Sequence, residues 1–261
     1  MASSKKHLFL KGAFKVSKIE KLVGLLKRLN SGEKIEEVEK DAENFLSQIN
    51  ATDLSIAEQQ LMDNGMEAED LRGLCVIHMQ MLEGEVEKMT AELEEGHPVA
   101  IMVQEHGVLL ETLEELESLN ATLQQNILTP KLQSELLRIV RILTGAELHH
   151  QREEQALFPI LEQRGISGPP TVMRLEHESL RPKKHGLEVL ATNALEIEHE
   201  EFKKQLAELS RYIIFNLRDH IFKENHILYP SAIEIITERE VWAKISEQCD
   251  KIGYTPYTKG K

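Results

Sequence analysis

A chain of 261 residues is long enough for one large domain or two modest ones, and its formal net charge of −13 argues against nucleic acid, whose phosphates must be neutralised by Lys and Arg. No apolar run approaches the roughly 20 residues that span a bilayer, and the N-terminus lacks the cleavage site of a signal peptide, so we expect a soluble cytoplasmic protein with no membrane partner. The only cysteines, Cys75 and Cys249, are too few for a thiolate cage, so any metal must lie among imidazoles and carboxylates.

Apolar residues recur at three- and four-residue spacing along the chain, and no segment alternates as a strand would, which predicts an all-α fold. Residues 1–94 are predicted to form a small helical domain. Its short helices are expected at residues 17–29, 35–49, 56–63 and 67–89. A second part with longer helices is expected to begin near Pro98, because proline suits the first turn of a helix.

Residues 95–237 are predicted to form an up-down four-helix bundle, because long helices joined by short connections pack as antiparallel neighbours. These helices are expected at residues 98–125, 130–162, 171–190 and 195–236. The remaining residues, 238–261, are predicted to hold one further short helix and a tail. Proline lacks an N–H and clashes with the preceding turn, so Pro182 should kink the third helix, and Pro159 and Pro230 should bend or break the second and fourth.

Two stretches of the chain share one pattern of His, three residues, Glu, five residues and Pro. They begin at His149 and His220, and each follows a Glu-His pair, which ends at His106 or His177. The same separation of 71 residues relates the two stretches and the two pairs. A single period shared by several positions indicates an internal repeat. We therefore expect two helical hairpins that direct matching side chains inward.

These repeated side chains are the candidate metal ligands. Residues i and i+4 share a face of a helix, so each repeated histidine projects together with the glutamate that follows it. Each Glu-His pair stands 43 residues before the next repeated histidine, which predicts that all six side chains meet at one level of the bundle. The six are His106, His149, Glu153, His177, His220 and Glu224. Four imidazoles and two carboxylates favour iron or manganese ahead of copper, and six ligands fit two metals better than one zinc.

The segment from about residue 97 to 236 resembles the hemerythrin-like, or HHE cation-binding, domains. The two Glu-His pairs and the two HxxxE segments, followed by LFP and LYP, match that family in order and spacing. The resemblance implies two iron ions between four helices, with the four histidines as terminal ligands and Glu153 and Glu224 as bridging carboxylates. Manganese and zinc are less expected than iron as the bound metal. Residues 17–92 and the tail are similar to an uncharacterised helical domain that often precedes such domains and names no chemistry.

One position departs from the family's pattern. Oxygen-carrying hemerythrins have a second histidine four residues after the one on the third helix, and this chain has Arg181 there. One iron would then lack an imidazole. Water, a carboxylate, His150 or His185 would take its place.

The pattern and the resemblance predict a non-haem diiron protein that binds O2, NO or a peroxide, in sensing, storage or stress response. Two alternatives stay open. One is a peroxidase-like or repair enzyme. The other is a metal-stapled adaptor without redox chemistry, whose N-terminal domain reports the metal state to a protein partner.

The neighbours of the six candidate ligands are given structural roles. Glu105 and Glu176 are interpreted as a solvated acidic face, in preference to acceptors that orient histidines. Phe158 and Tyr229 occupy the same place in the two repeats and are interpreted as core packing that keeps water out of the site.

Overall fold

The computed structural model describes residues 93–258 without a break, together with residue 90 and short stretches between residues 19 and 65. Regular structure in these residues is helical throughout, which confirms the predicted all-α fold. Among the described helices, none is both long and apolar enough to cross a membrane. The elements from residue 98 onward are α7 (Pro98–Gln125), α8 (Pro130–Gly145), α9 (Glu147–Arg152), η2 (Glu153–Leu157), α10 (Phe158–Gln163), α11 (Gly168–Thr192), α12 (His199–Lys223), η3 (Glu224–Leu228), α13 (Tyr229–Ile235) and α14 (Arg239–Ile252).

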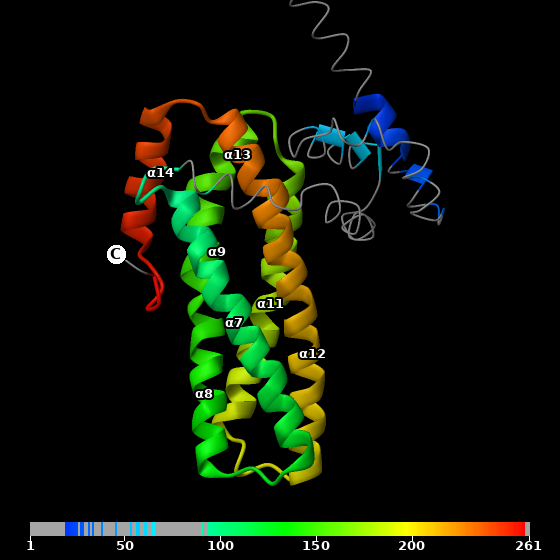
Figure 1. Ribbon diagram of the computed structural model, residues 1–261, viewed down its shortest axis with the longest axis vertical. Coiled ribbons are helices and arrows are strands. Elements are labelled where there is room, and N and C mark those ends of the chain that lie inside the picture. The colour runs from blue at the N-terminus through cyan, green and yellow to red at the C-terminus, as the bar shows by residue number, and fades with distance from the viewer. Residues whose placement is uncertain are drawn as a thin grey trace, which may run out of the picture. The chain divides into compact units, whose positions relative to one another are not determined.

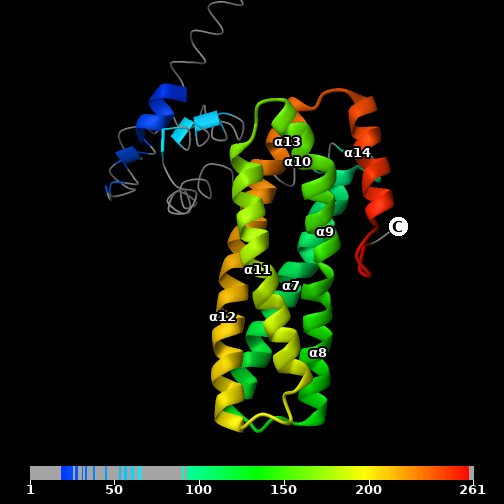
Figure 2. The same cartoon turned by 180° about the vertical axis from the view of Figure 1, so that it is seen from behind.

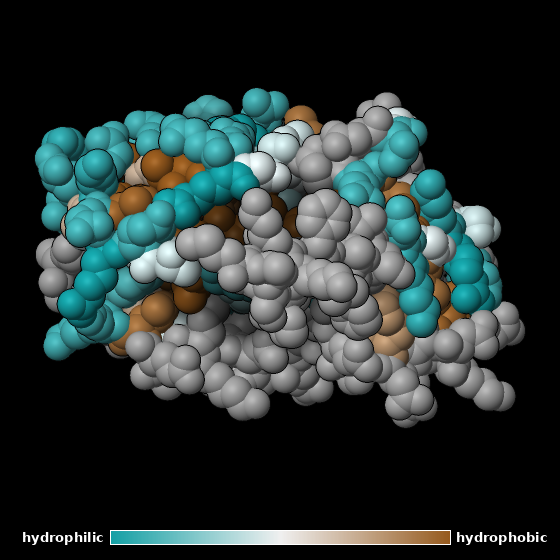
Figure 3. Space-filling view, turned by 90° about the horizontal axis from the view of Figure 1, so that it is seen from above, coloured by the Kyte–Doolittle hydropathy of each residue, from teal (hydrophilic) through white to brown (hydrophobic). Residues whose placement is uncertain are grey.

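Four helical stretches lie side by side in an up-down bundle, seen from opposite sides in Figures 1 and 2. They are α7, α8 with α9, α11 and α12. Apolar side chains from all four fill the interior, among them Leu113, Leu136, Leu187 and Leu217. Figure 3 shows hydrophilic side chains along the edge of the face seen from above, with apolar ones between them. Burial of the apolar stripe of each helix is what holds such a bundle together.

The chain divides into two compact units, each built from separate segments. One comprises residues 89–160, 173–222 and 236–261 and contains most of the bundle. The other comprises residues 1–88, 161–172 and 223–235. The predicted domain boundary near residue 94 stays a prediction.

Within the second unit, residues 19–25 and 27–28 are helical, which agrees with the first predicted helix. Leu25 and Val38 are buried in a small core there. The predicted helix at 67–89 lies outside the described residues, and only single residues or pairs of the helices at 35–49 and 56–63 are described, all of them helical.

Capping residues explain where the bundle helices begin. The His97 ring accepts the N–H of Val99 at 3.2 Å in front of α7, and Thr129 accepts the N–H of Leu132 at 3.3 Å in front of α8. In both helices a proline occupies the first turn, where its missing N–H is not needed. The helix predicted from residue 195 begins at His199 instead, because the Glu198 side chain accepts a backbone N–H of the first turn.

The helices that carry the two repeated glutamates widen directly after them. η2 begins at Glu153 and η3 at Glu224, and in each the N–H five residues on, from Phe158 or Tyr229, donates to the carbonyl of the glutamate. The widened turn precedes a proline that has no N–H for the helix ladder. Each helix continues beyond that proline, as α10 and α13, so neither proline breaks its helix. Such π turns are frequent at functional sites.

The one short helix predicted within residues 238–261 is present as α14 and packs beside the bundle. α14 contacts α7, α9 and η2. It ends at Gly253, whose φ of 97° suits a residue without a Cβ. The chain then turns back, so that residues 254–258 approach α7.

We expect Leu113→Ala to destabilise the bundle by about 2–5 kcal/mol, because the side chain is fully buried and its loss leaves a cavity. Chemical denaturation of the full chain measures the change. Ile127→Ala is the matched control: this side chain is 76% exposed, so its removal should change stability by about 0.5 kcal/mol or less. Equal effects of the two substitutions would contradict the described core.

Candidate metal centre

Two pairs of histidines bring their ring nitrogens together inside the bundle. The Nε2 atoms of His106 on α7 and His149 on α9 are 3.1 Å apart, and those of His177 on α11 and His220 on α12 are 3.0 Å apart. All four rings are buried. Two imidazole nitrogens bound at about 2.1 Å to neighbouring positions of one octahedral ion stand about 3.0 Å apart. The spacing in both pairs therefore suits a shared metal ion.

The hydrogen bonds of the second pair fix where its protons lie. His177 donates from Nδ1 to Glu154 at 2.7 Å, and His220 donates from Nδ1 to Glu176 at 2.9 Å. A neutral imidazole carries one ring hydrogen, so the two Nε2 atoms present lone pairs to each other across 3.0 Å. Two lone pairs at that distance in a buried site repel each other unless a proton or a metal ion lies between them. Histidines that bind a metal ion almost always donate their other ring N–H to a carboxylate, a carbonyl or water, and both rings have such a bond.

Glu153 lies between the two histidine pairs. Its Oε2 atom is 3.7 Å from Nε2 of His149 and 3.5 Å from Nε2 of His177. The side chain is fully buried. The same carboxylate oxygen therefore approaches one nitrogen of each pair. This buried cluster of histidine and glutamate has the donors and the spacing to hold a metal ion.

Glu105 and Glu176 are buried, so their interpretation as a solvated acidic face is wrong. Each accepts the Nδ1–H of a histidine on another helix: Glu105 from His149 at 2.7 Å, and Glu176 from His220 at 2.9 Å. Neither bond involves the histidine that is next in sequence. A carboxylate acceptor fixes the ring's tautomer and raises the basicity of Nε2, so both glutamates leave the Nε2 atom of their histidine able to bind a metal ion.

Glu105 also binds a buried cation. Arg152 donates to the same Oε2 atom at 2.5 Å, and its Nε donates to the carbonyl of Leu148 at 3.1 Å. Burial by itself would raise the pKa of Glu105, but the hydrogen bond from His149 and the charges of His149 and Arg152 lower it to about 2. Glu105 therefore stays ionised and acts as an acceptor at neutral pH.

The other oxygen of Glu105 faces the segment that follows α14. Thr255 donates to Oε1 at 3.4 Å, and the Thr258 hydroxyl donates to the same atom. A cavity of about 310 Å³ lies between α7 and this segment. It is lined by Gln104, Glu105, Gly107, Val108, Glu111, Tyr257 and Thr258. The C-terminal segment thus completes the surroundings of a carboxylate that orients a candidate ligand.

Arg181 is linked to the histidine cluster through a carboxylate. Its guanidinium donates to Glu147 at 3.0 and 3.2 Å and to Glu154 at 2.9 Å. Glu154 is also the acceptor for His177. Burial would raise the pKa of Glu154, but the hydrogen bonds from His177 and Arg181 lower it.

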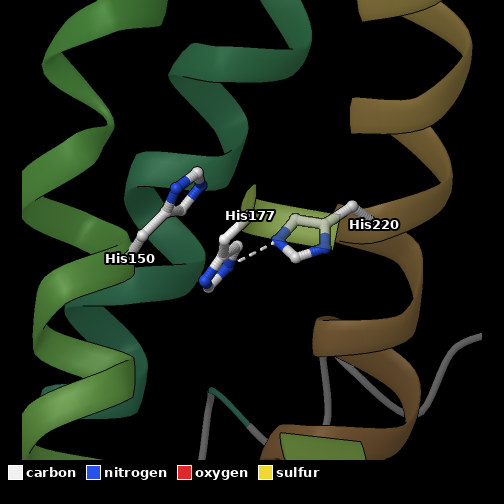
Figure 4. A group of neighbouring side chains, drawn as sticks. All are labelled: His150, His177 and His220. Atoms are coloured by element: carbon white, nitrogen blue, oxygen red, sulfur yellow. Dashed lines mark hydrogen bonds between the residues drawn. The ribbon is translucent and has the colours of Figure 1, made fainter. Parts of the chain in front are cut away.

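His150 reaches from α9 toward His177, as Figure 4 shows together with His220 on α12. Its ring stacks on that of His177, with centroids 3.8 Å apart and 8° between the planes, and meets the His220 ring edge-on at 5.7 Å. Burial lowers the pKa of His150 well below 6.5, and the charge of Lys184 lowers it further. His185, in contrast, is 73% exposed and lies away from these rings at the surface.

The predicted ligands that belong to the larger unit form one buried cluster: His106, His149, Glu153, His177 and His220. Glu224 is buried and opens η3 four residues after His220, as Glu153 opens η2 four residues after His149. Their role as metal ligands stays a prediction.

The sequence pattern does not identify Arg152, Glu154 or Thr258 as neighbours of the centre. For Arg152 a signal exists, because Lys223 follows it after the same 71 residues and both side chains are buried. The corresponding residue of the second repeat is Asn225 for Glu154, and Thr258 lies outside the repeat. No local pattern points to either.

We expect Glu105→Gln to lower metal affinity by about 10- to 100-fold, because a neutral amide binds the Nδ1–H of His149 less strongly and leaves Arg152 without its charge partner. Competition with a chelator measures the affinity. Thr258→Val is the control, since it removes one hydroxyl donor to the same carboxylate and leaves the bond to His149 in place. Wild-type affinity in Glu105→Gln would show that this carboxylate does not tune the centre.

Comparison with protein families agrees with this geometry. The model of the hemerythrin HHE cation binding domain matches residues 97–232, and that of a family of unknown function, DUF438, matches residues 22–88. No curated protein matches the chain. The first match covers more than half of the 261 residues and spans all six predicted ligands. The chain therefore belongs to the hemerythrin HHE cation-binding family, with a DUF438 region before its bundle.

Proposed function

We propose that this protein is a non-haem diiron protein that binds O2, NO or a peroxide, in sensing, storage or stress response. One observation carries the proposal: the Nε2 atoms of His177 and His220 converge to 3.0 Å in a buried interior, while the Nδ1 atom of each ring bonds a carboxylate. Membership of a family that binds metal cations supports it.

We assign the four repeated histidines as terminal ligands, two to each metal, and Glu153 and Glu224 as bridging carboxylates. The assignment of Glu153 is supported by its Oε2 atom, which lies within 3.7 Å of a nitrogen of each histidine pair. Glu224 is assigned by the repeat, because it stands to His220 as Glu153 stands to His149 and opens a π turn in the same way. The four histidines are His106, His149, His177 and His220.

Imidazole and carboxylate donors without a thiolate suit iron, and paired sites of this kind occur in the cores of helix bundles. Iron held there would supply a redox-active centre with a coordination position for O2, NO or a peroxide. The chain's carboxylates prepare the histidines for that role. Glu105, Glu154 and Glu176 each accept the Nδ1–H of a histidine. The basic Nε2 atoms of those three rings are then left to face inward.

The size of the ligand follows from burial. Each of the six assigned ligands is exposed by 1% or less. Two near-parallel rings pack against that of His177, with centroids 6.2 Å away for Phe158 and 3.8 Å away for His150. A centre enclosed in this way favours a diatomic molecule or a peroxide over a large substrate.

Full-length protein purified without oxygen should contain two irons per chain, and air should produce new charge-transfer bands in the near-ultraviolet and visible. Elemental analysis combined with the optical spectrum before and after air measures both. One zinc per chain, or a folded bundle without metal, would contradict the proposal and leave a structural role for the centre.

Replacing one carboxylate tests the ligand assignment. Glu153→Ala should lower metal content toward one ion or none, because the carboxylate near both histidine pairs is lost. His185→Ala should retain two ions, since this side chain is mostly exposed. Two ions bound with wild-type affinity in Glu153→Ala would rule out the bridging role.

A further inference from the structure

We propose that His150 is a fifth imidazole ligand of the metal centre, on the side of His177 and His220. The inference rests on the proposed function, because it adds a ligand to the same two-metal site. Neither repeat predicts it: the position 71 residues later is Ile221, so the donor occurs in one half of the chain only.

The first support is an unsatisfied nitrogen. His150 is 1% exposed, and its Nδ1 atom makes no hydrogen bond to any residue that the structure describes. The nearest carboxylate, that of Glu147, is 3.9 Å from Nδ1. Buried polar atoms nearly always have partners, and leaving one without a partner costs free energy. A metal ion within reach of this nitrogen would remove that cost.

The second support is position. Ligand nitrogens of His150, His177 and His220 lie within 4.8 Å of one another, and the three rings come from three different helices (Figure 4). Three imidazoles that converge from three directions can occupy neighbouring positions around one ion.

Two other residues considered for a fifth donor, Arg181 and His185, bond or face other groups. Arg181 carries a cationic guanidinium, which cannot ligate a cation, and it is bound to Glu147 and Glu154. His185 is exposed and lies 3.4 Å from the carboxylate of Glu188. Among the residues suggested by sequence for the missing imidazole, His150 is therefore the one whose nitrogens lie at the centre.

A fifth imidazole makes the two metal positions unequal. Three rings would serve the side of His177 and His220, and two would serve the side of His106 and His149. The metal with fewer protein donors keeps more room for O2, NO or a peroxide. The cavity beside α7 lies toward that side, since Glu105 both lines it and bonds His149.

The variant His150→Phe distinguishes a role as metal ligand from a role in packing. Phenylalanine preserves the stacking on His177 but removes the ring nitrogens. Ferrous iron binding to the full chain is measured without oxygen against a chelator, with helicity as the check on folding. We expect the variant to lose at least about tenfold in affinity for one of the two irons. X-ray absorption should show imidazole scattering falling from five rings per iron pair to four. His185→Ala should match the wild type.

His150→Phe with two irons, wild-type affinity and unchanged imidazole scattering would overturn the inference and leave His150 as a packing ring. A wild type without iron would instead overturn the proposed function itself. If His150→Phe does not fold, iron affinity is measured for His150→Ala with and without dissolved imidazole. Imidazole should restore the affinity if His150 is a ligand. Failure to restore it would count against the ligand role.

Discussion

The interaction on which the proposed centre depends is the convergence of two buried imidazole nitrogens, the Nε2 atoms of His177 and His220, 3.0 Å apart. His177 and His220 are held in this arrangement because each donates its Nδ1 proton to a carboxylate. Glu153 then stands between this pair and the second pair. A bundle that buries so many polar groups without a cation would lose stability, so the centre and the fold depend on each other.

The surroundings of the centre are less symmetric than the repeat that encodes it. Glu105 is shared by Arg152 and by threonines of the C-terminal segment, whereas Glu154 is shared by His177 and Arg181. On the side of His149, the carboxylate that accepts the histidine's hydrogen bond also contacts the C-terminal segment. On the side of His177, that carboxylate contacts Arg181 on α11.

Much of the fold and most of the centre could be predicted from sequence, for reasons that are physical. The period of 71 residues identifies four histidines and two glutamates, and helical periodicity finds α7 at its observed bounds. The partners of Glu105 and Glu176 could not be predicted, because sequence does not show which histidine on another helix each one meets. His149 and His150 are about 100° apart around a helix, so the pattern alone does not indicate that both rings face inward. The contact of Thr255 with Glu105 joins residues 150 apart and leaves no local trace.

The central claim is that a metal ion lies at each pair of converging Nε2 atoms. Anomalous diffraction at the iron edge, from crystals of the full chain grown without oxygen, tests it most directly. The account predicts two iron peaks, one beside His106 and His149 and one beside His177 and His220. A single peak elsewhere in the chain, or none at either pair in protein crystallised with iron, would contradict it.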